Sequence, residues 1–497
     1  MCGADGLRML PGTATPEARM TPDEYAELDA TALAALLRKG ELSADEVHDA
    51  ATTALDAVGP RLGAVVGERF AAPLEHAADG PFAGVPFAIK DLIVHAAGVP
   101  QGAGTRLLGD GIPMPADTHL MTRFRRAGLA TLARTATPEL GFNATTEPVA
   151  TGPVRNPWDT SRSPGGSSGG SAALVAARAL PVAHANDGGG SIRIPAAACG
   201  LVGLKPSQGR TSPGPDYADP LLGMGVEFVV TRTVRDAAGL LDAVHGHEPG
   251  DRYLLPDPPR PYADEVGTGS RRLRVAVCTT PFSGAGSVDP RCTEATEATA
   301  RVLEGLGHEV TRAAPELDAA AFDDANLVAW TSFLADGVDV LAAALGVEPG
   351  PDVLEAATLA CAEHGRALRA ADLYAADRVF NATRRAVAAF HQRFDLVLTP
   401  TMNVPNTPLG YLDQDDPSRD ARGWYDHIFS TAGFTALSNV TGNPAISLPL
   451  GRTEEGWPVG VQVMAPYGDE STLLALAADL ERAMPWDRHR PAGGSAT

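Results

Sequence analysis

Two glycine-rich segments on either side of an alanine-rich stretch place the strongest constraint on how this chain can fold. The first reads SPGGSSGGS (163–171), and the second reads NDGGGSIRIP (186–195). Between them, residues 172–180 have the composition of a buried helix and residues 182–186 that of a short strand. A fold keeps glycine runs where the backbone needs positive φ or close approach. The pattern therefore predicts two tight loops packed against a core.

Strand and helix patterns alternate along the chain, which favours an α/β fold. Residues 1–60 are expected to form an N-terminal helical segment and residues 61–497 the main domain, with a variable middle region at about 255–390. The helix that opens at the Ser43–Glu46 capping box is expected to stop at Gly59. Other expected strands are 85–94, 129–133, 273–278, 394–398, 445–450 and 459–464, and other expected helices are 31–39, 120–127, 290–307, 471–483 and most of 315–392.

The composition is that of a globular protein with a strong acidic excess. The chain has 497 residues, 44% of them hydrophobic, and a formal net charge of −21. Nucleic acids and anionic membranes are bound by basic patches, so we expect neither as a partner. The chain length is compatible with a homodimer as well as a monomer.

The cysteines and the N-terminus indicate a cytoplasmic protein. The five cysteines are scattered, and none has zinc-ligand spacing, so we expect no metal and a reducing compartment. The N-terminus lacks the basic and apolar pattern of a secretory signal. No run of about 18 apolar residues predicts a membrane span.

Lysine is almost absent from this chain. Of 40 basic residues only Lys39, Lys90 and Lys205 are lysines, and the rest are arginines. A lysine that persists in such a sequence can serve a purpose for which arginine is unsuited, chiefly the loss of its proton. This observation marks Lys90 and Lys205 as candidate functional residues.

The first glycine-rich segment has two simple interpretations. It could be a flexible linker, but it leads directly into the alanine-rich helix rather than into polar sequence. It also fits the nucleophile-elbow pattern G-x-S-x-G around Ser167, but that motif requires a preceding strand, which residues 158–164 do not form.

The second segment places Ser191 directly after three glycines. Successive glycine N–H groups can form a concavity that binds an anion. A serine beside it could attack a carbonyl group whose oxygen enters the concavity. The alternative is a tight turn before a helix that starts near Pro195.

A nucleophilic serine needs a base, and two residues are candidates. His184 lies in an apolar strand, where a core residue with satisfied hydrogen bonds is the simpler interpretation. Lys90 lies among Phe87, Ile89 and Leu92. Burial there would lower the lysine pKa by up to about 3–5 units. The alternative is an ordinary lysine paired with the neighbouring Asp91.

Taken together, these residues resemble the amidase signature family. The shared pattern is a lysine after a short apolar strand, then GGSSGGS, then D-x-G-G-S-I-R, with Ser167 and Ser191 lying 24 residues apart. Further matching segments are 156–158, 199–206, 441–449 and 458–462, so the resemblance spans roughly residues 25–485. It implies the amidase-signature fold, a central mixed twisted sheet covered by helices on both faces.

The resemblance also implies a role for each site residue. Ser191 corresponds to the nucleophile, Ser167, held by a cis peptide bond, to a proton relay, and Lys90, neutral at rest, to the base. The implied oxyanion hole consists of the backbone N–H groups of Gly188, Gly189, Gly190 and Ser191, and the implied supporting residues are Ser168, Asp187 and Arg193. No metal, nucleotide or organic cofactor is implied.

The substrate is constrained only by class. Within the family the sequence is similar to bacterial amidases that act on aminohexanoate dimers, so small uncharged amides are expected: cyclic or linear aminohexanoate amides, aryl amides or carbamates. Pocket residues are expected in segments 211–226, 320–345 and 405–430, with Trp330 and Trp424 as candidates that could equally be core residues.

Two other functions stay open at this point. A glutamyl-tRNA amidotransferase A-type subunit uses the same residues to release ammonia from glutamine, but Ile194 stands where its motif usually has glutamine. A non-catalytic scaffold would not need Lys90, Ser167 and Ser191 together.

Overall fold

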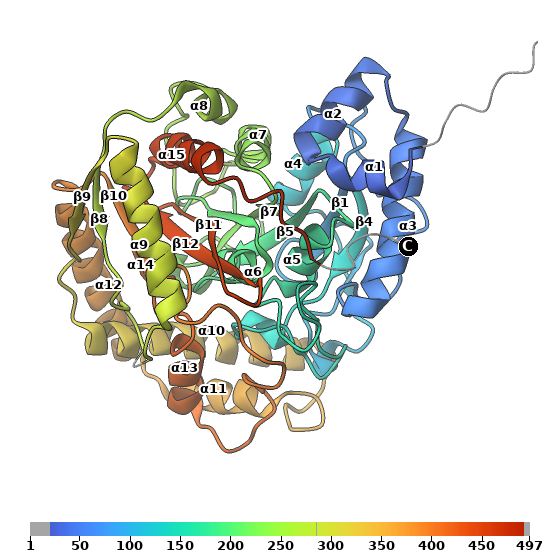
Figure 1. Ribbon diagram of the computed structural model, residues 1–497. Coiled ribbons are helices and arrows are strands. Elements are labelled where there is room, and N and C mark those ends of the chain that lie inside the picture. The colour runs from blue at the N-terminus through green and yellow to red at the C-terminus, as the bar shows by residue number, and fades with distance from the viewer. Residues whose placement is uncertain (1–19, 285, 492–497) are drawn as a thin grey trace, which may run out of the picture.

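Eight strands form a mixed sheet through the middle of the molecule (Figure 1). The computed structural model describes residues 20–284 and 286–491. The strand order is β5-β7-β6-β11-β12-β10-β8-β9, in which only the pairs β10–β8 and β8–β9 are parallel. The strand bounds are β5 Val182–Asp187, β6 Val202–Lys205, β7 Val226–Thr231, β8 Arg274–Val277, β9 Glu309–Arg312, β10 Leu396–Pro400, β11 Ala445–Arg452 and β12 Pro458–Met464.

Helices cover both faces of this sheet. Along β12, Val459, Val461 and Val463 belong to one apolar cluster, whereas Met464 belongs to another. Successive strand residues point to opposite faces, so each face has its own core. The first core includes residues of α9 (Pro290–Gly305) and α15 (Glu470–Ala483). The second includes residues of α10 (Ala319–Leu345), α12 (Ala370–His391) and α13 (Ala421–Phe429). The predicted α/β fold with a mixed central sheet is confirmed.

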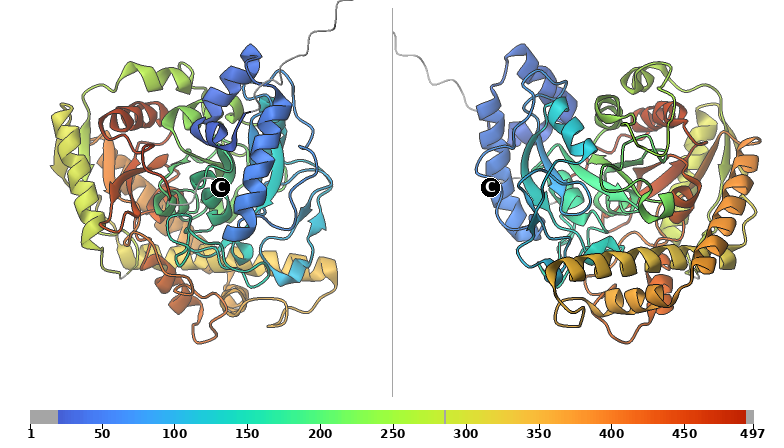
Figure 2. Two further views of the ribbon diagram at one scale, coloured as in Figure 1. Left: turned by 45° about the vertical axis from the view of Figure 1, so that its right-hand side comes forward. Right: turned by 180° about the vertical axis from the view of Figure 1, so that it is seen from behind.

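The N-terminal helices lie at one side of the molecule, next to a small parallel sheet (Figures 1 and 2). They are α1 Pro22–Glu27, α2 Ala30–Lys39 and α3 Ala44–Leu62, and the small sheet pairs β1 (Pro86–Lys90) with β4 (Ala130–Thr135). The capping box at Ser43 is confirmed. The expected stop at Gly59 is wrong, because α3 continues through Pro60 and ends at Gly63, whose φ of 65° ends the helix. The division at residue 60 stays a prediction.

Two central strands, β6 and β7, were not predicted from the sequence. All six residues of β7 are buried, so it lacks the alternation that marks a half-exposed strand, and β6 has only four residues. The expected strand 85–94 is shorter, because β1 ends at Lys90 and the backbone turns at Ile93, which has φ of 67°. This early end places Lys90 at the boundary between strand and loop.

The remaining elements connect and cover these layers. The helices are α4 His119–Ala127, α5 Gly169–Ala176, α6 Arg193–Cys199, α7 Val234–Val244, α8 Tyr262–Thr268, α11 Ala356–Ala367 and α14 Ala436–Thr441. Short 3-10 turns lie at Arg106–Leu108, Glu139–Gly141 and Pro220–Gly223, and β2 (Pro100–Gln101) pairs with β3 (Ile112–Pro113).

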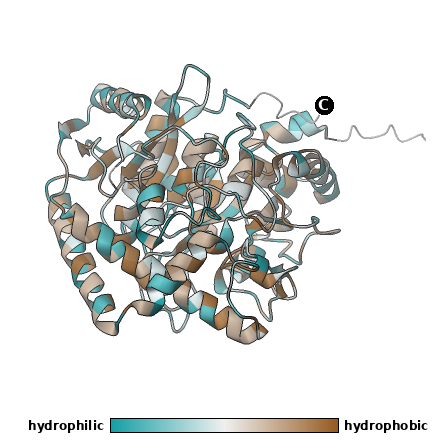
Figure 3. Ribbon diagram, turned by 90° about the horizontal axis from the view of Figure 1, so that it is seen from below, coloured by the Kyte–Doolittle hydropathy of each residue, from teal (hydrophilic) through white to brown (hydrophobic). Residues whose placement is uncertain are grey.

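Helix α10 runs along the lower edge of the molecule (Figures 1 and 2). By length and composition alone it could cross a membrane, which the sequence analysis did not anticipate. Its buried residues, among them Phe322, Trp330 and Leu334, pack in the second core. Seen from below, the helices at this edge alternate between apolar and polar residues (Figure 3). These contacts are those of a core helix.

Candidate active site

Lys90 ends strand β1 with its amine enclosed by polar groups. Its Nζ lies 2.7 Å from Ser167 Oγ, 3.1 Å from Ser168 Oγ and 2.5 Å from Asn186 Oδ1. The residue is fully buried. Burial lowers the Lys90 pKa to about 7, even though Glu227 and Asp187 favour the charged form. The amine is therefore able to lose its proton near neutral pH.

Two alternatives to Lys90 as the base were an ordinary lysine paired with Asp91 and a catalytic His184, and the contacts of both residues argue against them. Asp91 forms an ion pair with Arg134, with 3.0 Å between Arg134 Nη1 and Asp91 Oδ1. His184 is fully buried, and both of its ring nitrogens are engaged: Nδ1 accepts the Lys90 backbone N–H at 3.2 Å, and Nε2 lies 2.9 Å from Glu227 Oε2. His184 is thus a core residue with satisfied hydrogen bonds.

The first glycine-rich loop is buried and is neither a linker nor a nucleophile elbow. It follows irregular chain rather than a strand, and residues 163–171 are all buried. The Gly166–Ser167 peptide bond is cis. A Cβ atom on Gly166 would lie 2.2 Å from the carbonyl oxygen of Thr145, so only glycine fits there. The loop then turns into α5 and leaves the Ser167 hydroxyl facing Lys90.

The second loop is held by hydrogen bonds to its carbonyl groups. The carbonyl oxygens of Asp187, Gly189 and Gly190 accept from Asn439 Nδ2 at 2.9 Å, Thr435 Oγ1 at 2.6 Å and the Ile194 N–H at 2.7 Å, respectively. In a trans peptide the N–H points away from the C=O of the same unit. The N–H groups that follow these carbonyls therefore point away from those three partners; they belong to Gly188, Gly190 and Ser191.

Glycine is required sterically in this loop. Gly190 has φ of 139°, and a Cβ atom on it would lie 2.4 Å from Thr435 Oγ1. A Cβ atom on Gly188 would approach Leu221 and Trp330 to 3.0 and 3.2 Å. The loop is thus more than a tight turn before α6, because its glycines let the backbone lie directly against neighbouring side chains.

A buried ion pair spans the base of this loop. Arg193 Nε and Nη2 donate to Asp187 Oδ2 and Oδ1 at 2.9 and 2.8 Å, and both side chains are fully buried. Although burial alone would raise the Asp187 pKa, Arg193 outweighs it and lowers that pKa to about 2. The guanidinium has four further acceptors: the Thr435 carbonyl, Ser438 Oγ, Asn439 Oδ1 and Gln462 Oε1. Sequence reasoning missed the residues of α14 in this set, because they lie about 240 residues away along the chain.

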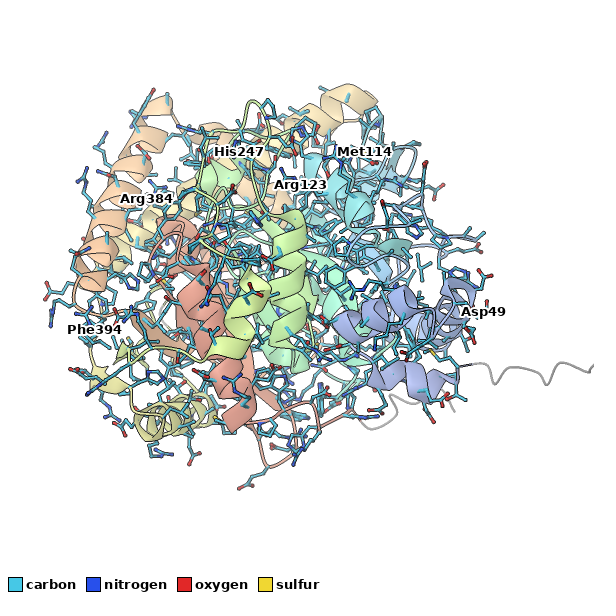
Figure 4. The ribbon with its side chains drawn as sticks, turned by 90° about the horizontal axis from the view of Figure 1, so that it is seen from above. Asp49, Met114, Arg123, His247, Arg384 and Phe394 are labelled. Carbon is cyan, nitrogen blue, oxygen red and sulfur yellow. The ribbon has the colours of Figure 1, made fainter. Side chains whose placement is uncertain are left out.

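A cavity of about 540 Å³ opens over the two loops. Ser167, Asn186, Gly188 and Ser191 contribute to its lining. The rest of the lining is mostly apolar and includes residues of α10 and of the segments around Leu92 and Leu108. Met114, also in the lining, lies on the half of the molecule opposite Phe394 (Figure 4).

Of the two tryptophans proposed for the pocket, only one lines the cavity. Trp330 lies in the lining together with Phe333. Trp424 is fully buried, and its indole N–H donates to the carbonyl of Phe142 at 3.2 Å. The Phe142 ring in turn stacks on Trp330 with centroids 4.4 Å apart. Trp424 therefore supports the cavity wall from behind, and its assignment as a lining residue is corrected.

The charged groups around the cavity are all acidic or histidine. Four carboxylates in the lining are Asp187, Asp216, Glu227 and Asp336. Asp216 pairs with His95 across 2.7 Å. No described lining residue is a lysine or arginine. Across residues 20–284 and 286–491, no group of three or more histidine, cysteine or acidic side chains could hold a metal ion.

Comparison with known proteins decides the family. The family model for amidases matches residues 32–474. The chain belongs to the amidase family. It is 39% identical over 492 residues to the 6-aminohexanoate-cyclic-dimer hydrolase of Paenarthrobacter ureafaciens, covering 93% of this chain and 96% of that protein.

Solved amidase structures have the same fold. A 6-aminohexanoate cyclic dimer hydrolase superposes with a TM-score of 0.87 at 37% identity, covering 94% of this chain and 99% of the other. A bacterial aryl acylamidase of the amidase signature family superposes with a TM-score of 0.81 at 25% identity, covering 93% and 97%. The protein is thus a hydrolase of carbon–nitrogen bonds in non-peptide amides.

Proposed function

We propose that this amidase hydrolyses small uncharged amides through an acyl-enzyme on Ser191, with Ser167 as proton relay and Lys90 as base. The observation that carries the proposal is the contact of 2.7 Å between the buried amine of Lys90 and the hydroxyl of Ser167. An amine with a pKa of about 7 is neutral in a large fraction of molecules at neutral pH. Such an amine can serve as a general base, which an ordinary cationic lysine cannot.

The proposed reaction has two halves. Lys90 takes a proton from Ser167 as Ser167 takes one from Ser191, and the Ser191 oxygen attacks the amide carbonyl. The same relay returns a proton to the leaving amine, so that the C–N bond breaks and the acyl group stays on Ser191. Water, deprotonated through the same relay, then attacks the acyl-enzyme and releases the acid.

The glycine loop is proposed as the oxyanion hole. The N–H groups of Gly188, Gly190 and Ser191 point away from the residues that bind the loop carbonyls, and Gly188 and Ser191 line the cavity. Fixed backbone donors of this kind stabilise the charge that develops on a carbonyl oxygen in the transition state. The Asp187–Arg193 ion pair would keep the donors in place before substrate binds.

The cavity favours an uncharged substrate over glutamine. Free glutamine carries an α-carboxylate, which proteins typically bind through arginine or lysine. The described lining holds carboxylates and no such cation. This counts against the amidotransferase-type activity and, by the same argument, against linear aminohexanoate amides with a free carboxylate. It leaves cyclic aminohexanoate amides, aryl amides and carbamates as the proposed substrates.

A panel of substrates tests the proposal. We would measure turnover of N-(4-nitrophenyl)butanamide, a neutral aryl carbamate, cyclic and linear 6-aminohexanoate dimers and glutamine. We expect activity on at least one neutral amide and none on glutamine. A neutral amide should also react at least about tenfold faster than a matched amide with a terminal carboxylate, because that group would be desolvated beside Asp216 and Glu227.

The nucleophile is identified by covalent labelling. A fluorophosphonate probe should modify the peptide that contains Ser191, and Ser191→Ala should lose both the label and the turnover. Ser171→Ala is a matched control, since its hydroxyl donates to the His184 carbonyl and does not line the cavity. Full activity in Ser191→Ala, or labelling at another serine, would contradict the proposal.

We further propose that the protein acts as a cytoplasmic enzyme. The described cysteines, Cys199, Cys278, Cys292 and Cys361, are buried and unpaired, which is compatible with a reducing compartment. Cys2 lies outside the described residues.

A further inference from the structure

Asn186 lines the cavity and presents its side-chain amide to the buried amine of Lys90. It lies in β5, one residue before Asp187, and is 7% exposed. Its Oδ1 lies 2.5 Å from Lys90 Nζ. We propose that Asn186 is a positioning residue that orients the lone pair of neutral Lys90 toward Ser167. This inference rests on the proposed function, since it assigns a direction to the proposed proton relay.

The orientation of the Asn186 amide is fixed by its other end. Nδ2 donates to the carbonyl oxygen of Leu92 at 3.4 Å, so Oδ1 must face the Lys90 amine. An amide oxygen only accepts hydrogen bonds. One N–H of Lys90 is therefore always directed at Asn186.

Ser168 takes the second N–H of Lys90. Its Oγ lies 3.3 Å from both the carbonyl oxygen and the backbone nitrogen of Asn186. A hydroxyl has one proton and can accept two hydrogen bonds. It donates that proton to the Asn186 carbonyl, so it can only accept from the Asn186 N–H and from Lys90 Nζ at 3.1 Å.

The third partner of the amine is then determined by elimination. A neutral amine has two N–H bonds and one lone pair. With both N–H groups directed at Asn186 and Ser168, the lone pair faces Ser167 Oγ at 2.7 Å, and the Ser167 hydroxyl donates to it. Transfer of that proton to Lys90 gives an ammonium whose three N–H groups meet the same three acceptors. No side chain has to move during the transfer.

Other charged groups near the amine do not replace Asn186. On β5, His184 is held neutral between the Lys90 backbone and Glu227, and Asp187 is bound to Arg193. On β7, Glu227 lies opposite Asn186 in the antiparallel register, and its Oε2 is bound to His184. After β1, Asp91 is bound to Arg134. Each charge near Lys90 thus has its own partner, and the amine is left with three neutral contacts.

Two variants of Asn186 test the inference. Asn186→Asp has nearly the same shape but places a negative charge beside Nζ, which favours the ammonium form of Lys90. Asn186→Leu is similar in size and offers no acceptor. The readout is the pH dependence of kcat/KM on N-(4-nitrophenyl)butanamide, together with carbon-13 NMR titration of the Lys90 Cε, which needs no activity.

We expect opposite behaviour in the two variants. In Asn186→Asp the apparent pKa of Lys90 should rise by at least about one unit, so the rate at pH 7 falls about fivefold or more and recovers toward pH 9. In Asn186→Leu the rate should fall about 10- to 100-fold at every pH, because the lone pair is no longer held toward Ser167. A purely structural role would lower both rates without moving the pKa.

The outcome separates this inference from the proposed function. If Ser191→Ala is inactive but Asn186→Asp titrates like the parent protein in both readouts, the role of Asn186 is wrong and the proposed function stands. If the parent protein hydrolyses no amide in the panel, the proposed function fails, and the NMR titration still tests the contact. An unshifted Lys90 signal in Asn186→Asp would overturn the inference in either case.

Discussion

Two lysines are completely buried in this protein, and only one of them contacts side chains that line the cavity. Burial lowers the pKa of both Lys90 and Lys205 to about 7. Lys90 Nζ contacts two serine hydroxyls and an amide oxygen, whereas Lys205 Nζ donates to the carbonyl oxygen of Pro206 at 2.8 Å. A lowered pKa therefore shows only that the proton can leave. The neighbours decide whether its departure can drive chemistry.

The largest expected effect comes from removing each amine in turn. Lys90→Met keeps the length of the side chain and removes the proposed base, so kcat should fall by about 10³-fold or more. Lys205→Met removes an amine whose hydrogen-bond partner, the Pro206 carbonyl, does not line the cavity, so kcat should stay within about threefold. Steady-state kinetics on the neutral aryl amide, with circular dichroism to check folding, measure both. Similar losses in the two variants would break the distinction between these lysines.

Arg193 contacts the base of the glycine loop and also lies near Lys205, and its substitution should give the next largest effect. It braces the glycine loop through Asp187, and its charge also favours the neutral form of Lys205. Arg193→Lys cannot reproduce a bidentate pair with four further acceptors, so we expect a loss of about 3 kcal/mol in unfolding free energy and about 100-fold in kcat.

Denaturant unfolding and kinetics on Arg193→Lys separate the two roles of this residue. If stability falls while kcat is unchanged, the ion pair supports the fold but not the oxyanion donors.

The pH dependence should belong to Lys90 alone. A base must be neutral to act, so kcat/KM should fall tenfold per pH unit below about 7 and level off above it. The Lys205→Met variant should show the same fall of kcat/KM below pH 7, because Lys205 does not contact the relay. If the fall of kcat/KM below pH 7 disappeared in Lys205→Met, the observed pKa would belong to Lys205, and this result would contradict the proposal.

A smaller effect concerns stability. Both lysines have a lower pKa in the folded chain than the value of 10.5 for a free side chain, so between about pH 7 and 10.5 the unfolded chain binds more protons. Unfolding free energy should therefore rise with pH across this window. In Lys205→Met, urea unfolding at pH 7.5 and 9.5 should show a rise that is smaller by up to about 2.5 kcal/mol. An unchanged rise would mean that Lys205 is not buried as a neutral amine.

The sequence was informative where chemistry imposes local patterns. The two glycine-rich loops, the rarity of lysine and the resemblance to a family pointed to Lys90, Ser167 and Ser191, and the structure brings the first two into contact and lines one cavity with both serines. The capping box at Ser43 also followed from a local pattern, whereas the mixed central sheet followed from the family resemblance.

The remaining features depend on contacts between distant segments. Strand β7 is buried on both sides, so its sequence lacks the alternation that marks an exposed strand. Trp424 and Trp330 are both buried aromatic residues on helices, and their different positions appear only in the packed structure, where the Phe142 ring stacks on Trp330 and the Phe142 carbonyl accepts from Trp424. Asn186 reads as an ordinary strand residue until the fold brings Lys90 beside it from another strand.

The most direct test of the account is a titration of the Lys90 amine itself. The chain has only three lysines, so carbon-13 labelling at lysine Cε gives a spectrum of three signals, and the Lys205→Met variant leaves two of them. We expect the buried signal to titrate with a midpoint near pH 7 and to disappear in Lys90→Met. A buried Lys90 signal that stays at its cationic position up to pH 10 would contradict the central claim that this amine is the base.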